Sequence, residues 1–290
     1  MHPQVKTFHD ARSGTATHVV FQAPGTPCAV IDPVFDLDPR SGHTSDAPVE
    51  KVAGFLSDQD LTIAWILETH VHHDHLSGAA SLKDRVGGQI GIGAGISEVE
   101  EAIRRVYDLD PPSGSTAAFD RLLRDGDVLD LGGLNIEVLA TPGHTLDHLS
   151  YRIGDAVFVG DTIFMPDSGT ARCDFHRGDA RQLYGSLQRL LALPPETRLF
   201  MCHDYGAGGS RPPAWESRVG EQFAGNIHVH AGVSETEYVA VRTERDRRLN
   251  APALLLPSLQ VNICAGRLPR PQSNGTVYLR MPLDIPGSAL

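Results

Sequence analysis

The stretch ETHVHHDHLSG (68–78) places four histidines and one aspartate within six positions. His70, His72, Asp74 and His75 follow the spacing H-x-H-x-D-H. Imidazole nitrogens and carboxylate oxygens are ligands of zinc, iron and manganese. Because the donors stand so close together, one loop could supply several ligands to one or two metal ions.

Three more candidate ligands follow apolar runs later in the chain. His144 ends LATPGH, Asp161 ends AVFVGD and His203 ends RLFMCH. Strand ends are places where a rigid scaffold can present side chains to a common point. Any one histidine could equally be solvated or capping, but the joint order of the four motifs favours a metal site. His73 and His148 have no partner in the pattern, and we predict that they are ordinary loop residues.

The elements that must position these donors can be read from the apolar periodicity. Residues 17–23, 28–36 and 61–70 are β-rich runs, and the last is almost continuously apolar. The stretches 127–145 and 149–164 each read as a pair of strands. Helices are predicted within 76–87, 96–107 and 179–194, and Ser97 and Glu100 are spaced as a capping box for the second of these. The order of elements predicts an α+β fold, with two packed sheets and helices outside them.

Composition narrows the class of protein. The chain has 290 residues, of which 41% are hydrophobic and 21% charged, and its formal net charge is -11. An acidic surface argues against nucleic-acid binding and against binding to anionic membranes. The sequence shows neither a signal-peptide pattern nor an apolar run of transmembrane length. The cysteines are widely spaced, so we expect reduced thiols in a cytoplasmic protein: Cys28, Cys173, Cys202 and Cys264.

Taken together, H-x-H-x-D-H, P-G-H-T, G-D-T and a strand-end histidine resemble the metallo-β-lactamase superfamily, and the likeness extends over nearly the whole chain. The resemblance implies an αββα sandwich with the metal site at one edge of the two sheets. We expect a single domain over residues 1–290, with an irregular, proline-rich C-terminal tail from about residue 265.

Two further segments, MPDSGTARCDF and CHDYGAGG, resemble the bacterial persulfide dioxygenases, also called sulfur dioxygenases, which are related to glyoxalase II. The resemblance implies oxidation of glutathione persulfide by O2 to sulfite and glutathione, with one Fe(II) per chain, and it suggests a homodimer. The iron ligands would be His70, His144 and Asp161. Arg172 and Tyr205 match positions near the thiol substrate. The remaining donors would orient the ligands and shape the pocket, or form a vestigial second metal site: His72, Asp74, His75 and His203.

Alternatives stay open at this stage. A glyoxalase II-like thioester hydrolase, or a lactonase, would use the same donors to hold two zinc ions or mixed metals. A binding or sensor protein on a decayed enzyme scaffold is disfavoured because no ligand is missing. Arg172 could instead form a structural salt bridge, and Tyr205 could simply pack. We interpret Cys173 as a pocket or core thiol.

Overall fold

The fold is that of a computed structural model, which describes residues 2–109 and 118–285. Its strands form two six-stranded sheets and one three-stranded sheet. The first sheet contains, in spatial order, β1 (Gln4–His9), β2 (Ala16–Phe21), β3 (Pro27–Ile31), β6 (Thr62–Leu67), β8 (Gln89–Gly93) and β9 (Arg121–Leu123). The second contains β10 (Val128–Asp130), β11 (Asn135–Ala140), β12 (Leu149–Ile153), β13 (Ala156–Phe158), β14 (Arg198–Phe200) and β15 (Glu216–Arg218). The small sheet contains β5 (Thr44–Ser45), β4 (Val34–Leu37) and β7 (Leu76–Ser77).

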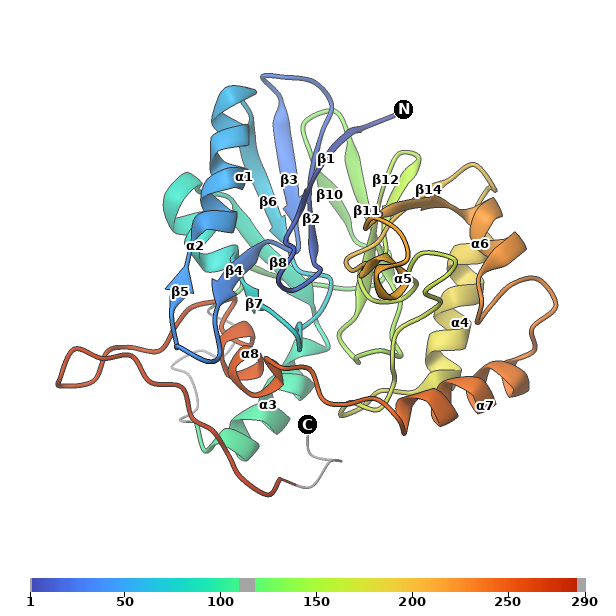
Figure 1. The fold of residues 1–290 in the computed structure, drawn as a ribbon. Coiled ribbons are helices and arrows are strands. Elements are labelled where there is room, and N and C mark those ends of the chain that lie inside the picture. The colour runs from blue at the N-terminus through green and yellow to red at the C-terminus, as the bar shows by residue number, and fades with distance from the viewer. Residues whose placement is uncertain (1, 110–117, 286–290) are drawn as a thin grey trace.

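Helices cover the outer face of each large sheet (Figure 1). On the first sheet these are α1 (Ala47–Asp58), α2 (Ala79–Val86), α3 (Ile96–Tyr107) and α8 (Leu255–Asn262). On the second sheet these are α4 (Ala180–Leu191), α6 (Val219–Gly225) and α7 (Glu235–Asp246). A single irregular turn, α5 (Gly206–Gly209), follows β14. The predicted αββα sandwich is therefore confirmed.

The apolar runs form strands because both faces of each sheet are buried. In β2, Val19 packs toward the helices, and the next residue, Val20, packs into the layer between the sheets. In β13, Val157 faces the helices of the second sheet, and Phe158 faces the space between the sheets. Successive side chains of a strand point to opposite faces, so a strand covered on both sides must be apolar at nearly every position.

The strand directions bring the motif loops to one edge. β3 and β6 are parallel. In the second sheet β13 and β14 are parallel, and β11 runs in the same direction because it and β13 are each antiparallel to β12. The four motifs lie in the loops that follow β6, β11, β13 and β14. These loops therefore lie together at one edge of the sandwich.

Backbone hydrogen bonds join the two halves of the chain at this edge. Ala16 N–H donates to the carbonyl of Cys202 at 2.6 Å, and Leu149 N–H donates to that of Thr69 at 2.8 Å. The hydroxyl of buried Tyr151 donates to the carbonyl of Glu68 at 2.7 Å. Each bond ties a strand end of one sheet to the other sheet, which fixes the spacing across the edge.

The predicted helix at 96–107 is present, but its capping box is wrong. The helix begins at Ile96, and its N-cap is Gly95, so Ser97 already lies inside the first turn. A Cβ at Gly95 would stand 2.9 Å from the Cα of Asp147, which explains why a glycine occupies the cap. Glu100 instead accepts a hydrogen bond from Arg104 at 2.6 Å.

The C-terminal region approaches the edge before it leaves the sandwich. After α8, the described residues 263–285 form no helix or strand, and they extend along the first half of the molecule (Figure 1). Within the described ranges, every helix is too short or too polar to cross a membrane.

Gly143, in the loop after β11, offers a test of how this edge is built. Its φ is +135°, and an added Cβ would lie 2.2 Å from the backbone nitrogen of Leu183 in α4. We expect Gly143→Ala to lower the free energy of unfolding by about 2 kcal/mol or more and to reduce metal retention, because His144 is the next residue. Urea unfolding and metal analysis measure both effects.

The matched control is Gly185→Ala, which lies within α4 and has open space around its Cβ position. This change should raise stability by about 0.5–1 kcal/mol, because alanine favours the helix. Equal stability of the two variants would show that the loop after β11 tolerates displacement.

Candidate metal centre

The loop between β6 and β7 carries four of the predicted donors, and a buried carboxylate holds it. Asp32 follows β3 and lies beside the end of β6. Its side chain accepts hydrogen bonds from the backbone N–H of Thr69 at 2.7 Å, from the Thr69 hydroxyl at 3.0 Å and from His72 Nε2 at 3.0 Å. Glu68 Oε2 lies 3.3 Å from the same His72 nitrogen. His72 is thus left with Nδ1 as its free ring nitrogen.

Asn262, the last residue of α8, fixes the other side of this loop. Its side-chain N–H groups donate to the carbonyls of His72 and His75, each at 2.8 Å, and its oxygen accepts from Ser77 N–H at 2.8 Å. From the second sheet, Asp147 accepts from Val71 N–H at 2.8 Å. The loop is therefore held from three sides.

His70, His144 and Asp161 form the first donor group. Nε2 of His70 lies 4.0 Å, and Nε2 of His144 lies 3.6 Å, from Asp161 Oδ2. Ligands about 2.1 Å from one ion, at angles of 90–109°, are about 3.0–3.4 Å apart, so these atoms stand near ligand spacing. The structure brings these three residues together from separate segments, and all three ligand atoms lie within 4.8 Å of one another.

Hydrogen bonds orient each member of this group. His144 Nδ1 donates to the carbonyl of Arg172 at 2.7 Å, and His70 Nδ1 lies 3.0 Å from the Thr69 hydroxyl. Both contacts leave Nε2 of the ring as the lone-pair nitrogen that faces Asp161. The backbone N–H of Asp161 donates to His148 Nε2 at 3.0 Å.

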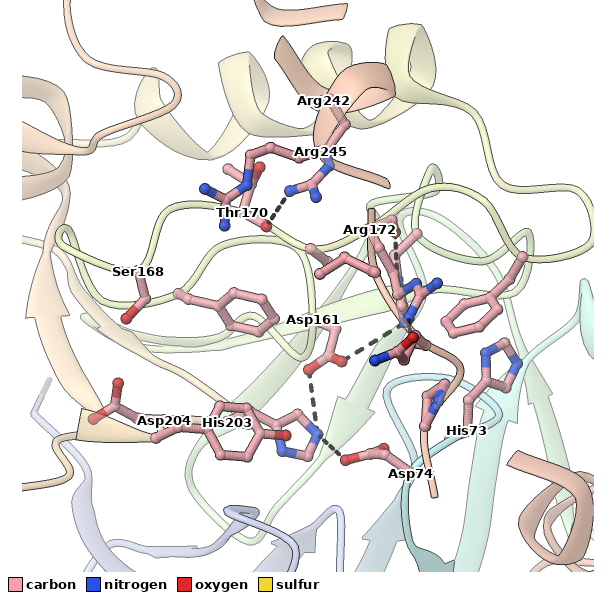
Figure 2. A pocket seen from close by; sticks show the side chains of 18 residues that line it. His73, Asp74, Asp161, Ser168, Thr170, Arg172, His203, Asp204, Arg242 and Arg245 are labelled. Atoms are coloured by element: carbon pink, nitrogen blue, oxygen red, sulfur yellow. Dashed lines mark hydrogen bonds and ion pairs between the residues drawn. The ribbon is translucent and has the colours of Figure 1, made fainter. Parts of the chain in front are cut away.

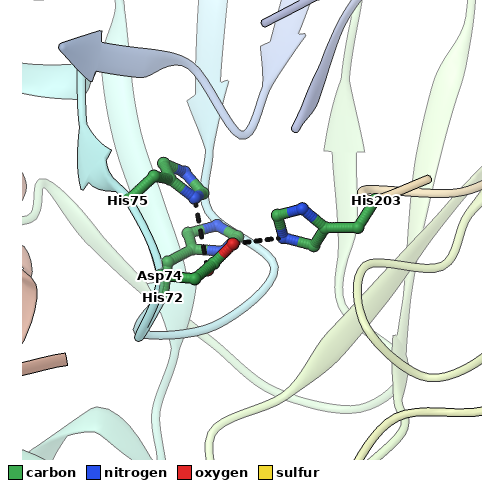
Figure 3. Close-up of side chains that lie close together, drawn as sticks. All are labelled: His72, Asp74, His75 and His203. Carbon is green, nitrogen blue, oxygen red and sulfur yellow. Dashed lines mark ion pairs between the residues drawn. The ribbon is translucent and has the colours of Figure 1, made fainter. Parts of the chain in front are cut away.

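His72, Asp74, His75 and His203 form the second donor group (Figure 3). The first three come from one loop, and His203 reaches them from the end of β14 on the opposite sheet. His203 Nε2 lies 3.2 Å from Asp74 Oδ2 and 3.5 Å from Asp161 Oδ1. Asp161 therefore turns one oxygen to each group, and all seven predicted donors meet at one place.

The buried atoms that lack partners support the presence of a metal. Among the described residues, six donor atoms in the two groups are buried without a hydrogen-bond partner. Such atoms are rare in folded proteins because an unpaired buried polar atom forfeits its hydration. A bound cation would satisfy them: His70 Nε2, His72 Nδ1, Asp74 Oδ2, His75 Nε2, Asp161 Oδ1 and His203 Nε2. The donor set thus makes a metal-binding site of nitrogen and oxygen ligands.

At His70 and Asp74 the electrostatic environment favours the protonation states that ligation requires. Burial and the neighbouring imidazoles hold the pKa of His70 well below its usual value, so the ring stays neutral. Burial alone would raise the pKa of Asp74, but the imidazoles of His203 and His75 hold it well below its usual range. Neutral imidazole and ionised carboxylate are the forms that bind metals. At His72 burial alone would lower the pKa, but the carboxylates of Asp32 and Glu68 raise it well above its usual value.

A cavity of about 410 Å³ opens from this centre (Figure 2). Asp74, His144, Asp161 and His203 line its inner end, together with His73. The apolar part of its wall is formed by Phe164, Ala171, Phe175, Leu249 and Pro252. Three arginines line the cavity: Arg242 and Arg245 lie farther from Asp74 and His203 in Figure 2, and Arg172 lies nearer Asp161.

The two predicted substrate-binding residues both lie on the cavity wall. Arg172 is engaged there: its Nε and Nη2 donate to Asp174 at 2.6 and 2.7 Å, and its Nη1 donates to the carbonyl of Asn250 at 2.7 Å. The salt bridge named as the alternative is thus present, and two N–H groups remain for a ligand. Tyr205 is 63% exposed, and its ring stacks on His203 with an interplanar angle of 7°.

Several residues at the centre were missed or misread in the sequence. His148 lies in a loop, as predicted, but it is buried, and its Nε2 accepts a hydrogen bond from the backbone N–H of Asp161, a contact that the sequence did not indicate. His73 is also buried and lines the cavity. Asp32 follows the apolar run CAVI, and the rule that picked Asp161 at its strand end would have found it. Arg242 and Arg245 gave no signal beyond a cation-rich helix.

The chain is similar to several known proteins. A family model for the metallo-β-lactamase superfamily matches residues 12–203, a range that contains both donor groups. A probable metallo-hydrolase of Burkholderia pseudomallei is 45% identical to the chain, over 97% of this chain and 99% of that protein. A β-lactamase hydrolase-like protein of Xylella fastidiosa is 47% identical over 97% of this chain, which spans 65% of that relative's length.

Two further similarities bear on chemistry. A hydroxyacylglutathione hydrolase of Pseudomonas entomophila is 30% identical over 81% of this chain and 75% of that protein. Among solved structures, ETHE1 from Myxococcus xanthus superposes with a TM-score of 0.72 and 29% identity, over 91% of this chain and all of that chain.

The variant Arg172→Ala tests whether Arg172 contacts the substrate or has only a structural role. We expect Arg172→Ala to raise KM about 10-fold, the loss of one charge-assisted hydrogen bond, with metal content near that of the wild type. Steady-state kinetics and metal analysis provide the test.

Asp174→Asn is the matched control. It removes the negative charge that faces the Arg172 guanidinium, and the asparagine side chain keeps the shape of the aspartate. If Arg172 contacts substrate, Asp174→Asn should leave KM unchanged or lower it. If both variants instead lose stability and metal to the same extent, Arg172 acts only through the salt bridge.

Proposed function

Because this chain belongs to the metallo-β-lactamase superfamily, we propose that it is a glutathione-dependent persulfide dioxygenase with one Fe(II). The reaction is GSSH + O2 + H2O → GSH + SO3²⁻ + 2H⁺. The outer sulfur loses four electrons, O2 accepts them, and the S–S bond breaks to leave the thiol. The GTARCDF segment and the similarity to ETHE1 of Myxococcus xanthus support this proposal.

One observation carries the proposal: two histidines and one carboxylate, His70, His144 and Asp161, stand together, and the last two line the cavity. Two histidines and a carboxylate on one face are the ligand set of non-haem Fe(II) oxygenases. A bound Fe(II) would supply open coordination positions for a sulfur ligand and O2, and the capacity for electron transfer.

The side chains of the protein have separate roles in this proposal. The Arg172 carbonyl keeps the His144 ring in the orientation for ligation. Phe164 and Phe175 line the cavity beside the donors and would exclude water from the reacting sulfur. His72, Asp74 and His75 follow a strand of the first sheet, His203 follows one of the second, and the four would position the ligands of the centre.

The second donor group favours one alternative, a dinuclear thioester hydrolase. Asp161 Oδ1 lies 3.5 Å from His203 Nε2, so the carboxylate could bridge two ions. The Pseudomonas entomophila relative is named as a hydroxyacylglutathione hydrolase, which also supports this alternative. In that case two zinc ions or mixed metals would be held, and water would be the nucleophile.

The activity itself is the first test. Anaerobically purified protein, supplied with Fe(II) and glutathione persulfide, should consume O2 and release sulfite in equal amounts. An oxygen electrode and a sulfite assay follow the two species. Rapid turnover of lactoylglutathione, without O2 uptake in the presence of persulfide, would favour the hydrolase.

Metal stoichiometry distinguishes the two donor groups. His70→Ala, His144→Ala and Asp161→Ala each remove one of three proposed ligands and should leave little iron bound. His203→Ala should retain iron and lose about 10- to 100-fold in affinity or activity, because it removes only a supporting residue. Iron is measured by plasma emission spectroscopy after gel filtration.

The wild type serves as the reference for this series, and one equivalent of iron is expected. If the wild type binds two equivalents and His203→Ala or Asp74→Ala removes one of them, the mononuclear proposal fails in favour of the dinuclear hydrolase.

A further inference from the structure

The cavity wall contains three arginines, and two of them are neutralised by the protein itself. Arg172 forms a bidentate pair with Asp174. Arg242 is buried and bonds to Asp246 through Nε at 2.9 Å and Nη2 at 2.5 Å. Nη1 of Arg172 donates to the carbonyl of Asn250, and Nη1 of Arg242 donates to that of Thr170. Neither arginine brings a net charge to the cavity.

Arg245 differs from both. It lies in the last turn of α7 and lines the cavity, yet its guanidinium forms no hydrogen bond or ion pair with any of the described residues. Its charge is felt by a neighbouring histidine: burial, then the charge of Arg242 and then that of Arg245 lower the pKa of His228 to about 4. The neighbouring Arg247 and Arg248 both pair with Glu244.

The position of Arg245 relative to the metal centre matters. In Figure 2, Arg242 and Arg245 lie on one side of Asp161, and Asp74 and His203 lie on the other. Apolar side chains, including Phe164 and Leu249, line the wall as well. The cavity therefore offers a candidate metal centre at one end, apolar surface along its wall, and one unpaired positive charge on the side of Asp161 away from Asp74 and His203.

We propose that Arg245 binds a carboxylate of the substrate and thereby selects extended, anionic thiol conjugates over small persulfides. This inference rests on the proposed function, because it takes the reacting sulfur to lie at the metal centre. Only a molecule long enough to span the cavity can contact both the metal centre and Arg245. The planar guanidinium suits a carboxylate, which can accept two N–H bonds from it. Inorganic hydropersulfide is too short to reach both ends.

Kinetics of the iron-loaded protein test the selection. Arg245→Gln should raise KM for glutathione persulfide about 10-fold, because one charge-assisted contact is lost at an exposed site. The kcat and the iron content should not change. KM for 2-hydroxyethyl persulfide, which has no carboxylate, should stay the same. Added salt should raise KM of the wild type and have less effect on the variant.

Arg248→Gln is the matched control, since it removes an arginine from the same region of the chain that pairs with Glu244 and does not line the cavity. It should behave as the wild type with both persulfides. The proposal is overturned if Arg245→Gln leaves KM for glutathione persulfide unchanged, or if it raises KM equally for both substrates.

A binding measurement separates this proposal from the reaction. S-methylglutathione carries the same carboxylates without a reactive sulfur, and calorimetry gives its Kd for wild type and variants. Weaker binding to Arg245→Gln, but not to Arg248→Gln, supports the carboxylate contact even if the wild type consumes no O2. Equal binding to all three proteins refutes it, whatever the activity.

Discussion

The metal centre depends on one buried carboxylate, Asp32. It lies at the end of β3 in a left-handed conformation with φ of +51°. Burial alone would raise the pKa of Asp32, but the charge of His72 and hydrogen bonds from His72 and Thr69 lower it to about 2. A buried carboxylate is tolerated when several donors replace its hydration. Those donors belong to the loop after β6. The hydrogen bonds that replace the hydration of Asp32 are therefore the same ones that hold this loop in shape.

A second constraint is that neither sheet can build the centre alone. The first sheet supplies His70 and the second supplies His144 and Asp161. The hydrogen bonds between the halves, such as that from Leu149 N–H to the Thr69 carbonyl, set the distance between these contributions. A small change in how the sheets pack would shift ligand atoms that must agree to within fractions of an ångström. Metal binding and the integrity of the sandwich are therefore coupled.

The cavity imposes a third constraint. Its wall is formed by the loop after β13, by α7 and by the residues that follow α7. Within that wall, charge is distributed unevenly. Arg172 and Arg242 are used to hold the chain, the latter through Asp246, which also accepts from the backbone N–H of Cys173 at 2.9 Å. Arg172 keeps two N–H groups for a ligand, and the guanidinium of Arg245 has no partner among the described residues. In a chain with a formal net charge of -11, one unpaired cation in the cavity that opens from the donor groups is a local feature that the overall charge does not reveal.

The sequence by itself determined the donors and the strands that carry them. Apolar runs that end in His144, Asp161 or His203 are local patterns, and local periodicity is enough to place a strand and its end. The αββα order followed in the same way. Only the tertiary structure decided which supporting side chains meet those donors. Asp32 and His72 are 40 residues apart in the chain, and Arg172 and Asn250 are 78 apart. Such contacts arise from the packing of whole elements, which no local pattern encodes, and they decided which arginine is paired and which is free.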